Sequence, residues 1–414
     1  MAYQTVTKNS YGSRLKNALS GVAMGFVLLI AGVVLLFWNE KRTVYTTRML
    51  KAAQKVCVHV DDIQTVNPEL NGKTVHMNGF ATTDEILSDS YFGIKTNAIK
   101  LKVDVEYYQY VENKHEERRD KVGGGEEVIT TYTYEKRWVP SLVNSSSFAD
   151  PDYKNANNRQ PILTLEDQQY VAEKVTFGAY TLSSSLKNQI SNDAAFDIEP
   201  DQTRIDQINA EAKKLYMDTT SDYVHVQNNV IYLGRSTSAP EIGDSRITYT
   251  RTMPCDASII AKVNGDTFEA FTHTNGYSLE TLSEGTHSMD EMFATEHSSN
   301  KTTAWILRVL GILLLYWGFK NIFGILDTLA KVLPFLSSIV GLGTGLVAGI
   351  LALALGLTVI AISWIWYRPL LGIVLLAVVV AMIWFFAKKG KEKKAAQAAA
   401  EAAAAPEPPA APAE

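Results

Sequence analysis

The feature that most constrains this chain is the concentration of its apolar residues at the two ends. Residues 21–38 carry no charge and read GVAMGFVLLIAGVVLLFW. Folded as a helix, such a run rises about 27 Å, close to the hydrocarbon thickness of a bilayer. It ends in FWNEKR, a poor signal-peptidase site, so the sequence predicts an uncleaved signal anchor after a polar tail at residues 1–20. We therefore expect an integral membrane protein.

A second apolar region fills the C-terminal third of the chain. Three further crossings are expected there, over residues 304–319, 342–366 and 370–386. Residues 320–341 are interpreted as an interfacial or amphipathic segment, and residues 367–369 as a short polar loop. Arg308 lies near the start of its run, where a long cationic side chain can reach the interface, so we interpret it as structural. Residues 387–414 hold lysines and then an Ala/Pro-rich stretch, which predicts a disordered tail.

Between the apolar ends, residues 39–303 have the mixed composition of a water-soluble domain. The segment IKLKVDVEYYQY at residues 99–110 alternates apolar and polar side chains, as a strand does, and VITTYTYEKRW at 128–138 is rich in β-branched and aromatic residues. The charged, glycine-containing stretch between them predicts a hairpin with a long exposed loop. RIDQINAEAKKLYM at residues 204–217 has helical spacing. The middle is thus predicted to be an α+β domain with mainly antiparallel sheet.

The distribution of positive charge predicts the orientation. Four crossings would place both termini on one side of the membrane. Lysines and arginines are frequent in residues 1–20, 320–331 and 387–414, whereas the short loop at 367–369 holds only Arg368. By the positive-inside rule, both termini are expected in the cytosol and the domain outside it, periplasmic in a bacterium and lumenal in a eukaryote.

Charge and motif content argue against several functions. The net charge of −5 gives no electrostatic reason to expect a nucleic-acid partner. The chain has no P-loop, HExxH, GxSxG or paired CxxC motif, and its seven histidines show no metal-ligand spacing. We therefore predict no catalytic, cofactor-binding or metal-binding residues and no enzymatic activity.

Small residues four positions apart recur in the apolar runs. They are Gly21 and Gly25 in the first run, and Gly341, Gly345 and Gly349 in the third. The second group resembles a nucleotide-binding loop only in its glycines, because it lies in an apolar run that no soluble strand precedes. Such spacing lets membrane helices approach closely, so all five are predicted helix-packing residues, within one chain or between chains.

The two cysteines, Cys57 and Cys255, both fall in the predicted extracytosolic domain. An oxidising compartment would allow one disulfide between them, and two unpaired buried thiols are the alternative.

Several segments, spread along the chain, carry a resemblance to a known family. They are Asn39-Glu40 followed by Arg42 and Val44, VHMNGF at 75–80, LSDSYFGI at 87–94, AIKL at 98–101, VEYYQYVE at 105–112, EIGDSRI at 241–247 and YRPL at 367–370. In this order they resemble the transmembrane protein 43 family, also called LUMA.

The resemblance implies one crossing, a large domain and three further crossings. Animal members of the family reside in the endoplasmic reticulum and inner nuclear membrane, self-associate and act as scaffolds, and no catalytic residues carry over. The expected function is thus a self-associating scaffold, whose partners are the lipid bilayer, a second copy and an unidentified protein. Its expected location is the cell membrane in a bacterium, or the endoplasmic reticulum or inner nuclear membrane in a eukaryote. The alternatives are a transporter or channel component and an enzyme with an unrecognised site.

Overall fold

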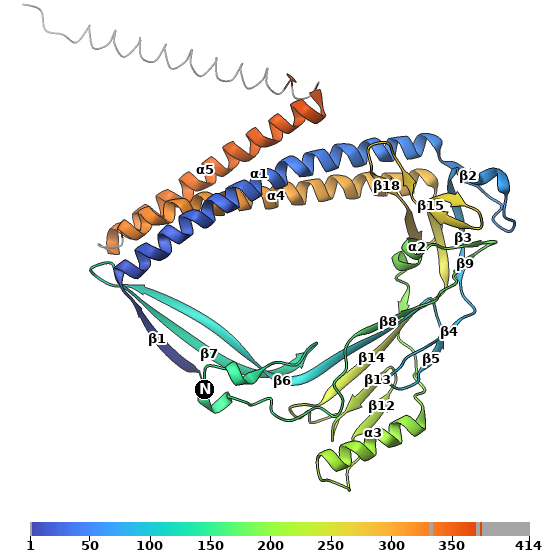
Figure 1. The fold of residues 1–414 in the computed structure, drawn as a ribbon, viewed down its shortest axis with the longest axis horizontal. Coiled ribbons are helices and arrows are strands. Elements are labelled where there is room, and N and C mark those ends of the chain that lie inside the picture. The colour runs from blue at the N-terminus through green and yellow to red at the C-terminus, as the bar shows by residue number, and fades with distance from the viewer. Residues whose placement is uncertain (1, 331–333, 370–372, 375–414) are drawn as a thin grey trace, which may run out of the picture. The chain divides into compact units, whose positions relative to one another are not determined.

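The computed structural model describes residues 2–330, 334–369 and 373–374, and they divide into two compact units. The sheet unit comprises Met1–Asn17, Tyr45–Asn300 and Thr328–Ser338. The helix unit comprises Ala18–Val44, Lys301–Asp327 and the segment from Ile339 onward. Figure 1 labels the elements of both units.

Three long helices contain the apolar runs. They are α1 (Tyr11–Val56), α4 (Met289–Ala330) and α5 (Pro334–Tyr367). In each, a stretch is long and apolar enough to cross a bilayer, in agreement with the crossings predicted at 21–38, 304–319 and 342–366. The described part of the chain thus holds three candidate spans, whereas the sequence predicts four. The fourth, at 370–386, lies outside the described residues except for Ile373 and Val374.

The helices extend well beyond their apolar runs. Helix α1 begins after Ser10, whose hydroxyl accepts a hydrogen bond from the Ser13 amide at 3.2 Å, and it continues 18 residues past Trp38. Its last turns, from Tyr45 onward, belong to the sheet unit, within which Met49, Leu50 and Ala53 pack with Ile260 and Phe293. Helix α4 continues to Ala330, so residues 320–330, predicted as an interfacial segment, extend the same helix.

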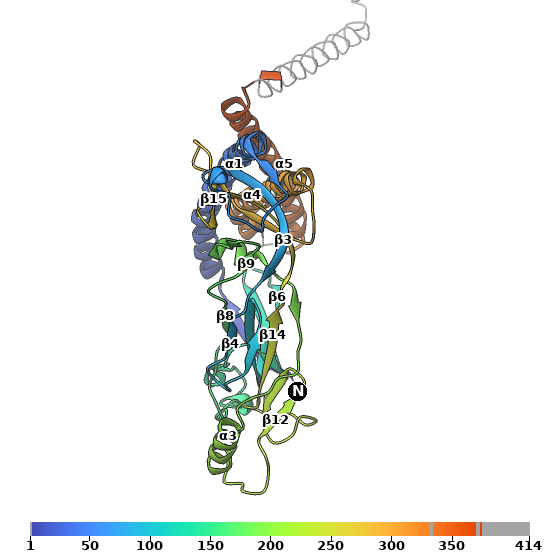
Figure 2. The same cartoon turned by 90° about the vertical axis from the view of Figure 1, so that its right-hand side faces the viewer.

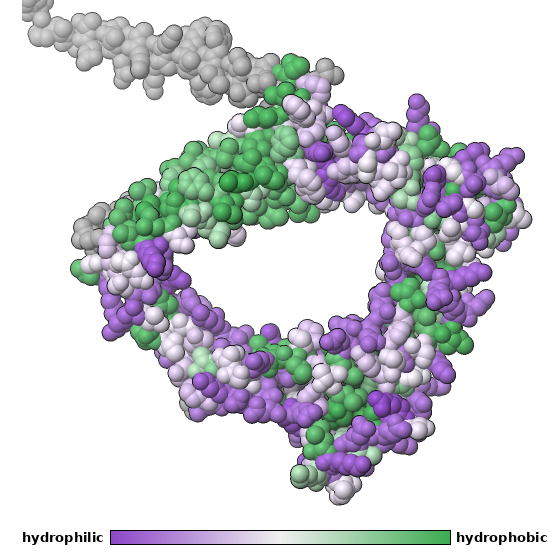
Figure 3. Space-filling view, in the orientation of Figure 1, coloured by the Kyte–Doolittle hydropathy of each residue, from purple (hydrophilic) through white to green (hydrophobic). Residues whose placement is uncertain are grey.

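The helix unit has a small apolar core and an apolar surface. Leu36, Leu315 and Ala352 are buried together between the three helices. Many large apolar side chains of the same helices are exposed, as the green surface of Figure 3 shows, and examples are Phe26, Ile30, Val34, Leu313 and Leu353. An apolar surface of this extent is suited to lipid rather than to water.

The larger sheet of the sheet unit is antiparallel throughout. Its main path runs β1 (Tyr3–Asn9), β7 (Glu126–Val139), β6 (Lys100–Asp120), β14 (Ser245–Thr252), β13 (Val230–Leu233) and β12 (Val224–Gln227). Strands β8 (Gln168–Val171) and β11 (Asp193–Ala194) pair with β6 and β14 respectively. The predicted hairpin is confirmed, since the whole of β7 pairs with Tyr107–Asp120 of β6.

The charged loop predicted within that hairpin is strand instead. Gly123 and Gly124, at φ +89° and +82°, form a tight turn that lets the strands pair up to Asp120 and Glu126. Opposite charges on neighbouring positions also form ion pairs, including Lys121–Glu127 at 3.0 Å. These contacts order a segment whose composition alone indicated a mobile loop.

The second sheet closes on itself. Strand β3 (Thr74–Thr82) pairs with β15 (Cys255–Asn264), which pairs with β16 (Thr267–Glu269). The cycle returns to β3 through β10 (Tyr180–Thr181) and β9 (Thr176–Phe177). Strands β2 (Val58–Val60) and β19 (Thr281–Glu284) flank the cycle, and two short hairpins, β4–β5 (Ile86–Ser88, Lys95–Asn97) and β17–β18 (Phe271–Thr272, Ser278–Leu279), complete the strands.

One continuous apolar core joins the two sheets. It contains Val103, Val105 and Ile247 from the larger sheet, and Met77 and Phe177 from the closed sheet. The short helix α2 (Ser184–Gln189) adds Leu186 to this core. The domain therefore has the predicted mixed α+β character with mainly antiparallel pairing.

Helix α3 (Gln202–Leu215) confirms the predicted helix near residues 204–217. It lies beside β12 in both views (Figures 1 and 2) and buries Ile205, Ile208 and Ala212. Asp201 caps its N-terminus by accepting a hydrogen bond from the Thr203 amide at 2.9 Å. The helix ends two residues early, where Met217 adopts a positive φ of +53°.

Candidate functional site

A buried ion pair joins the three helices of the helix unit. The Glu40 side chain on α1 is 0% exposed, and its Oε1 accepts a hydrogen bond from Arg308 Nε on α4 at 2.6 Å. Its second oxygen, Oε2, accepts one from Trp364 Nε1 on α5 at 2.7 Å. We call Glu40, Arg308 and Trp364 the Glu40 cluster. Because both carboxylate oxygens are bonded to different helices, this one side chain fixes the relative register of all three.

Pairing explains how these charges are tolerated at the edge of apolar runs. A buried carboxylate is costly unless a partner and hydrogen bonds compensate it. Arg308, 11% exposed, also lies over the rings of Trp305 and Trp364 at 4.9 and 5.8 Å. The Arg308 guanidinium points toward the neighbouring helices, so the structural role interpreted from the sequence takes the form of an ion pair. Glu40 was missed, although its opposite charge at the matching end of another apolar run was a usable signal.

Further polar contacts surround the Glu40 cluster. Asn39 Nδ2 donates to the Ala304 carbonyl at 2.9 Å, and Thr43 Oγ1 donates to the Asn39 carbonyl at 2.7 Å. Asn39 Oδ1 is buried without a hydrogen-bond partner among the described residues. The rings of Phe37 and Tyr367 contact each other at 5.5 Å. The motif that begins at Tyr367 is thus in contact with the turn of α1 that precedes Asn39-Glu40.

The structure places the predicted packing glycines at two kinds of position. A Cβ on Gly25 would lie 2.7 Å from the Gly318 carbonyl oxygen, so the backbones of α1 and α4 touch there within one chain. Gly21 lies in ordinary contact range, with its built Cβ 4.0 Å from the Asn321 oxygen. A Cβ built on Gly345 would lie 3.8 Å from Tyr316 Oη, and one built on Gly349 would lie 4.0 Å from Tyr316 Cε2. The surroundings of Gly341 are outside the described side chains.

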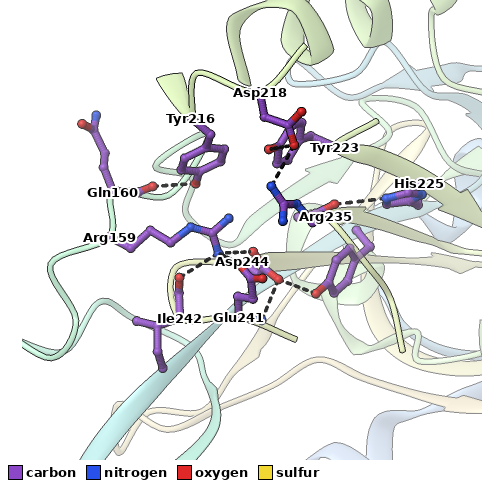
Figure 4. A network of polar contacts seen from close by, with 12 residues as sticks. Arg159, Gln160, Tyr216, Asp218, Tyr223, His225, Arg235, Glu241, Ile242 and Asp244 are labelled. Atoms are coloured by element: carbon purple, nitrogen blue, oxygen red, sulfur yellow. Dashed lines mark hydrogen bonds and ion pairs between the residues drawn. The ribbon is translucent and has the colours of Figure 1, made fainter. Parts of the chain in front are cut away.

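In the sheet unit, Asp244 is the centre of a second buried polar network (Figure 4). Its fully buried carboxylate accepts hydrogen bonds from Arg159 Nη1 at 2.8 Å, Tyr232 Oη at 2.6 Å and the Glu241 amide at 2.9 Å. Arg159 also donates to the Ile242 carbonyl at 3.0 Å. Burial raises the pKa of Asp244, while its three donors act in the opposite direction.

The Asp244 network is surrounded by contacts that leave it little space. A Cβ on Gly234 would lie 2.3 Å from the Asp244 carboxyl carbon, and Gly243 adopts φ +89° beside the Arg159 backbone. The Arg159 guanidinium covers the Tyr216 ring at 4.3 Å. The Asp244 carboxylate is hydrogen-bonded to Arg159, Tyr232 and the Glu241 amide, so we interpret the EIGDSRI motif as one that holds loops onto the sheet.

The LSDSYFGI motif has a comparable structural role. The Asp89 carboxylate accepts hydrogen bonds from the amides of Tyr91, Phe92 and Ile94 at 2.6, 3.0 and 3.3 Å. Gly93 supplies the positive φ of +69° that this turn needs. The motif therefore shapes the connection between β4 and β5.

Three histidines line a cavity of about 310 Å³ next to β3. The Nδ1 atoms of His59 and His76 lie 2.8 Å apart, and His76 Nε2 lies 3.0 Å from the His287 carbonyl oxygen. Burial lowers the pKa of His76, and the neighbouring His59 lowers it further. Within the described residues, no group of three or more His, Cys, Asp or Glu side chains could hold a metal ion.

The two cysteines are free thiols in the structure, so the disulfide considered from the sequence is not formed. Cys57 directly precedes β2, whose Val58 pairs with Val75 near the start of β3, whereas Cys255 pairs with Ala81 near its end. Six residue steps along a strand separate these positions by about 20 Å. A disulfide requires Cα atoms within about 7 Å, so the pair cannot bond in this fold.

These features define the class of protein: a membrane protein with apolar helices and a large domain of mixed helix and sheet, in which the buried carboxylates of Glu40 and Asp244 are bonded within the fold. The chain belongs to the transmembrane protein 43 family, whose sequence profile matches residues 107–369. It is 28% identical to transmembrane protein 43 of Homo sapiens over 371 residues, which is 89% of each chain. It is also 28% identical to the Drosophila melanogaster homolog over 362 residues, 85% of this chain and 90% of the relative. No solved structure matches the chain.

Proposed function

We propose that this protein is a self-associating membrane scaffold without enzymatic activity. The observation that supports this most is the use of its buried charges. Glu40 and Arg308 bond helix to helix, and Asp244 bonds loop to sheet, so these groups stabilise structure rather than face a reactive cleft. A membrane anchor with a large folded domain suits an organiser of other molecules.

The proposed partners are the lipid bilayer, a second copy of the chain and a protein that remains to be identified, with no nucleic acid and no cofactor. The exposed apolar side chains of α1, α4 and α5 supply the surface for lipid and for a second copy. We propose that the termini are cytosolic and that most of the sheet unit is extracytosolic, on the positive-inside argument. The membrane would be the cell membrane in a bacterium, or the endoplasmic reticulum or inner nuclear membrane in a eukaryote.

Co-purification of two differently tagged copies tests self-association. The copies are expressed together, extracted in mild detergent and captured by one tag, and the second tag is then quantified. Scaffolding predicts that the second copy is recovered. Copies expressed separately and mixed after extraction provide the control for association within micelles. Recovery no higher than in that control would contradict the proposal.

A transport or channel role is the second candidate, and one observation favours it. Asn39 Oδ1 is buried without a described partner beside the buried Glu40, and polar groups inside helix bundles often mark ion or substrate paths. Ion flux through proteoliposomes containing the purified protein, lost on Asn39→Leu substitution, would support this candidate over scaffolding. Absence of flux in both would argue against it.

A further inference from the structure

The N-terminal segment, predicted from sequence as a free polar tail, forms an edge strand of the larger sheet. Strand β1 pairs antiparallel with β7 in a register that joins Tyr3 to Tyr132 and Asn9 to Glu126. Side chains reinforce the pairing, since Gln4 Nε2 donates to Thr131 Oγ1 at 3.1 Å and Asn9 Nδ2 donates to Glu126 Oε2 at 3.2 Å.

The first turn of α1 is attached to the turn of the same hairpin. Arg14, only 7% exposed, forms an ion pair with Asp120 at 2.7 Å. Its Nη1 also donates to the carbonyls of Gly124 and Gly125 at 3.0 and 2.9 Å. A cation in the first turn of a helix opposes the helix dipole, so its position depends on these acceptors. This anchor is therefore specific to the hairpin turn.

A close aromatic contact completes the attachment. The ring of Tyr11 lies against Gly124, where a built Cβ would be 2.5 Å from Tyr11 Cδ2. Gly124 also has φ +82°, a conformation that side chains disfavour. The turn of the hairpin is thus shaped to receive the start of α1.

The hairpin itself belongs to the domain that follows α1. Strand β6 has 21 residues, which corresponds to about 70 Å of extended chain, and its first half pairs with β14 and β8. Its second half is exposed and charged, with Lys114, Glu116 and Arg118 on consecutive outward positions. Such strands cannot lie against lipid.

We infer that residues 3–14 and the β6–β7 turn form one clamp and lie on the same side of the membrane. The apolar run at 21–38 therefore does not separate the N-terminal segment from the hairpin turn. If the N-terminus is cytosolic, as the distribution of charge favours, the turn of the hairpin is cytosolic as well. If the turn is extracytosolic, the N-terminus is extracytosolic as well. Residues 3–14 and the hairpin turn therefore have the same orientation with respect to the membrane.

Disulfide trapping in the full-length protein tests the clamp. In a background with Cys57→Ser and Cys255→Ser, the pair Val6→Cys and Ile129→Cys replaces directly opposite residues, whose Cβ atoms lie about 5 Å apart in such ladders. The matched control replaces Thr130 in place of Ile129, which moves the second thiol to the other face of the strand. Thiols that remain after mild oxidation of native membrane vesicles are counted with a PEG-maleimide.

The clamp predicts loss of both thiols within one chain in the register pair and retention of both in the control. Equal thiol counts in the two pairs, or disulfides only between chains, would overturn it. Separate single-cysteine variants, Lys8→Cys and the exposed Val122→Cys at the hairpin turn, are then labelled with an impermeant maleimide from each face of oriented vesicles. Labelling of both from the same face is expected, and labelling from opposite faces would overturn the inference. Both substituted positions are exposed, so these variants are expected to fold.

Discussion

Removing Arg308 from the Glu40 cluster gives the most informative perturbation of the helix unit. An Arg308→Met variant keeps most of the side-chain volume but leaves the Glu40 carboxylate, 0% exposed, without its cation at 2.6 Å. Breaking a buried pair in this way costs about 3–5 kcal/mol, whereas replacing both partners with neutral groups is often close to neutral. A loss of about 3 kcal/mol lowers the ratio of folded to unfolded protein roughly a hundredfold.

The assay is unfolding of the purified protein by SDS in mixed micelles, followed by tryptophan fluorescence. The double variant Glu40→Gln with Arg308→Met is expected to recover most of the loss seen in Arg308→Met. Lys301→Met is the control, because it removes an exposed cation from the same helix and should change stability by about 0.5 kcal/mol or less. The reasoning is refuted if Arg308→Met costs no more than the control, or if the double variant is as unstable as the single one.

Three further results are expected in the sheet unit. Asp244→Ala leaves its buried donors without an acceptor and should destabilise the unit by about 3 kcal/mol, seen as faster amide exchange in β13 and β14; unchanged exchange would contradict it. Because the pKa of His76 is lowered on folding, the unfolded state binds more protons, so stability that is present above about pH 6.5 is lost as the pH falls. The His76→Gln substitution should reduce this pH dependence of stability, measured by thermal unfolding at pH 7.5 and 5.5. An undiminished dependence would contradict the prediction. Burial raises the pKa values of Cys57 and Cys255 to about 11, so both thiols should react slowly with maleimide near neutral pH, whether or not the protein has been reduced. Labelling only after reduction would contradict the presence of two free thiols.

The hydrophobic periodicity of the sequence was sufficient to predict those helices and strands whose surroundings stay the same along their length. Each apolar run in α1, α4 and α5 meets the same apolar environment along its length. In β6, one face of the strand is buried over many residues, which produces the alternation of apolar and polar side chains. The core face of α3 followed from spacing for the same reason. Of the four apolar residues at helical spacing, Ile205, Ile208 and Ala212 are buried, whereas Leu215 at the end of the helix is exposed.

Elements that depend on distant partners were not predictable in this way. Strands β9 and β10 have only two residues each, and they exist because the closed sheet supplies neighbours on both sides. The segment YQTVTKN before α1 is polar enough to suggest a tail, and it becomes a strand only through β7. The Glu40–Arg308 pair similarly joins positions 268 residues apart, so neither residue alone indicates the contact.

The proposed scaffold role rests on self-association in a lipid environment. The most direct measurement is the mass of the particle extracted from its native membrane into nanodiscs without a detergent step, by native mass spectrometry. Self-association predicts a defined assembly of two or more 45.7 kDa chains that persists on dilution. A single chain per particle at every concentration would contradict self-association and leave the chain as a monomeric membrane anchor.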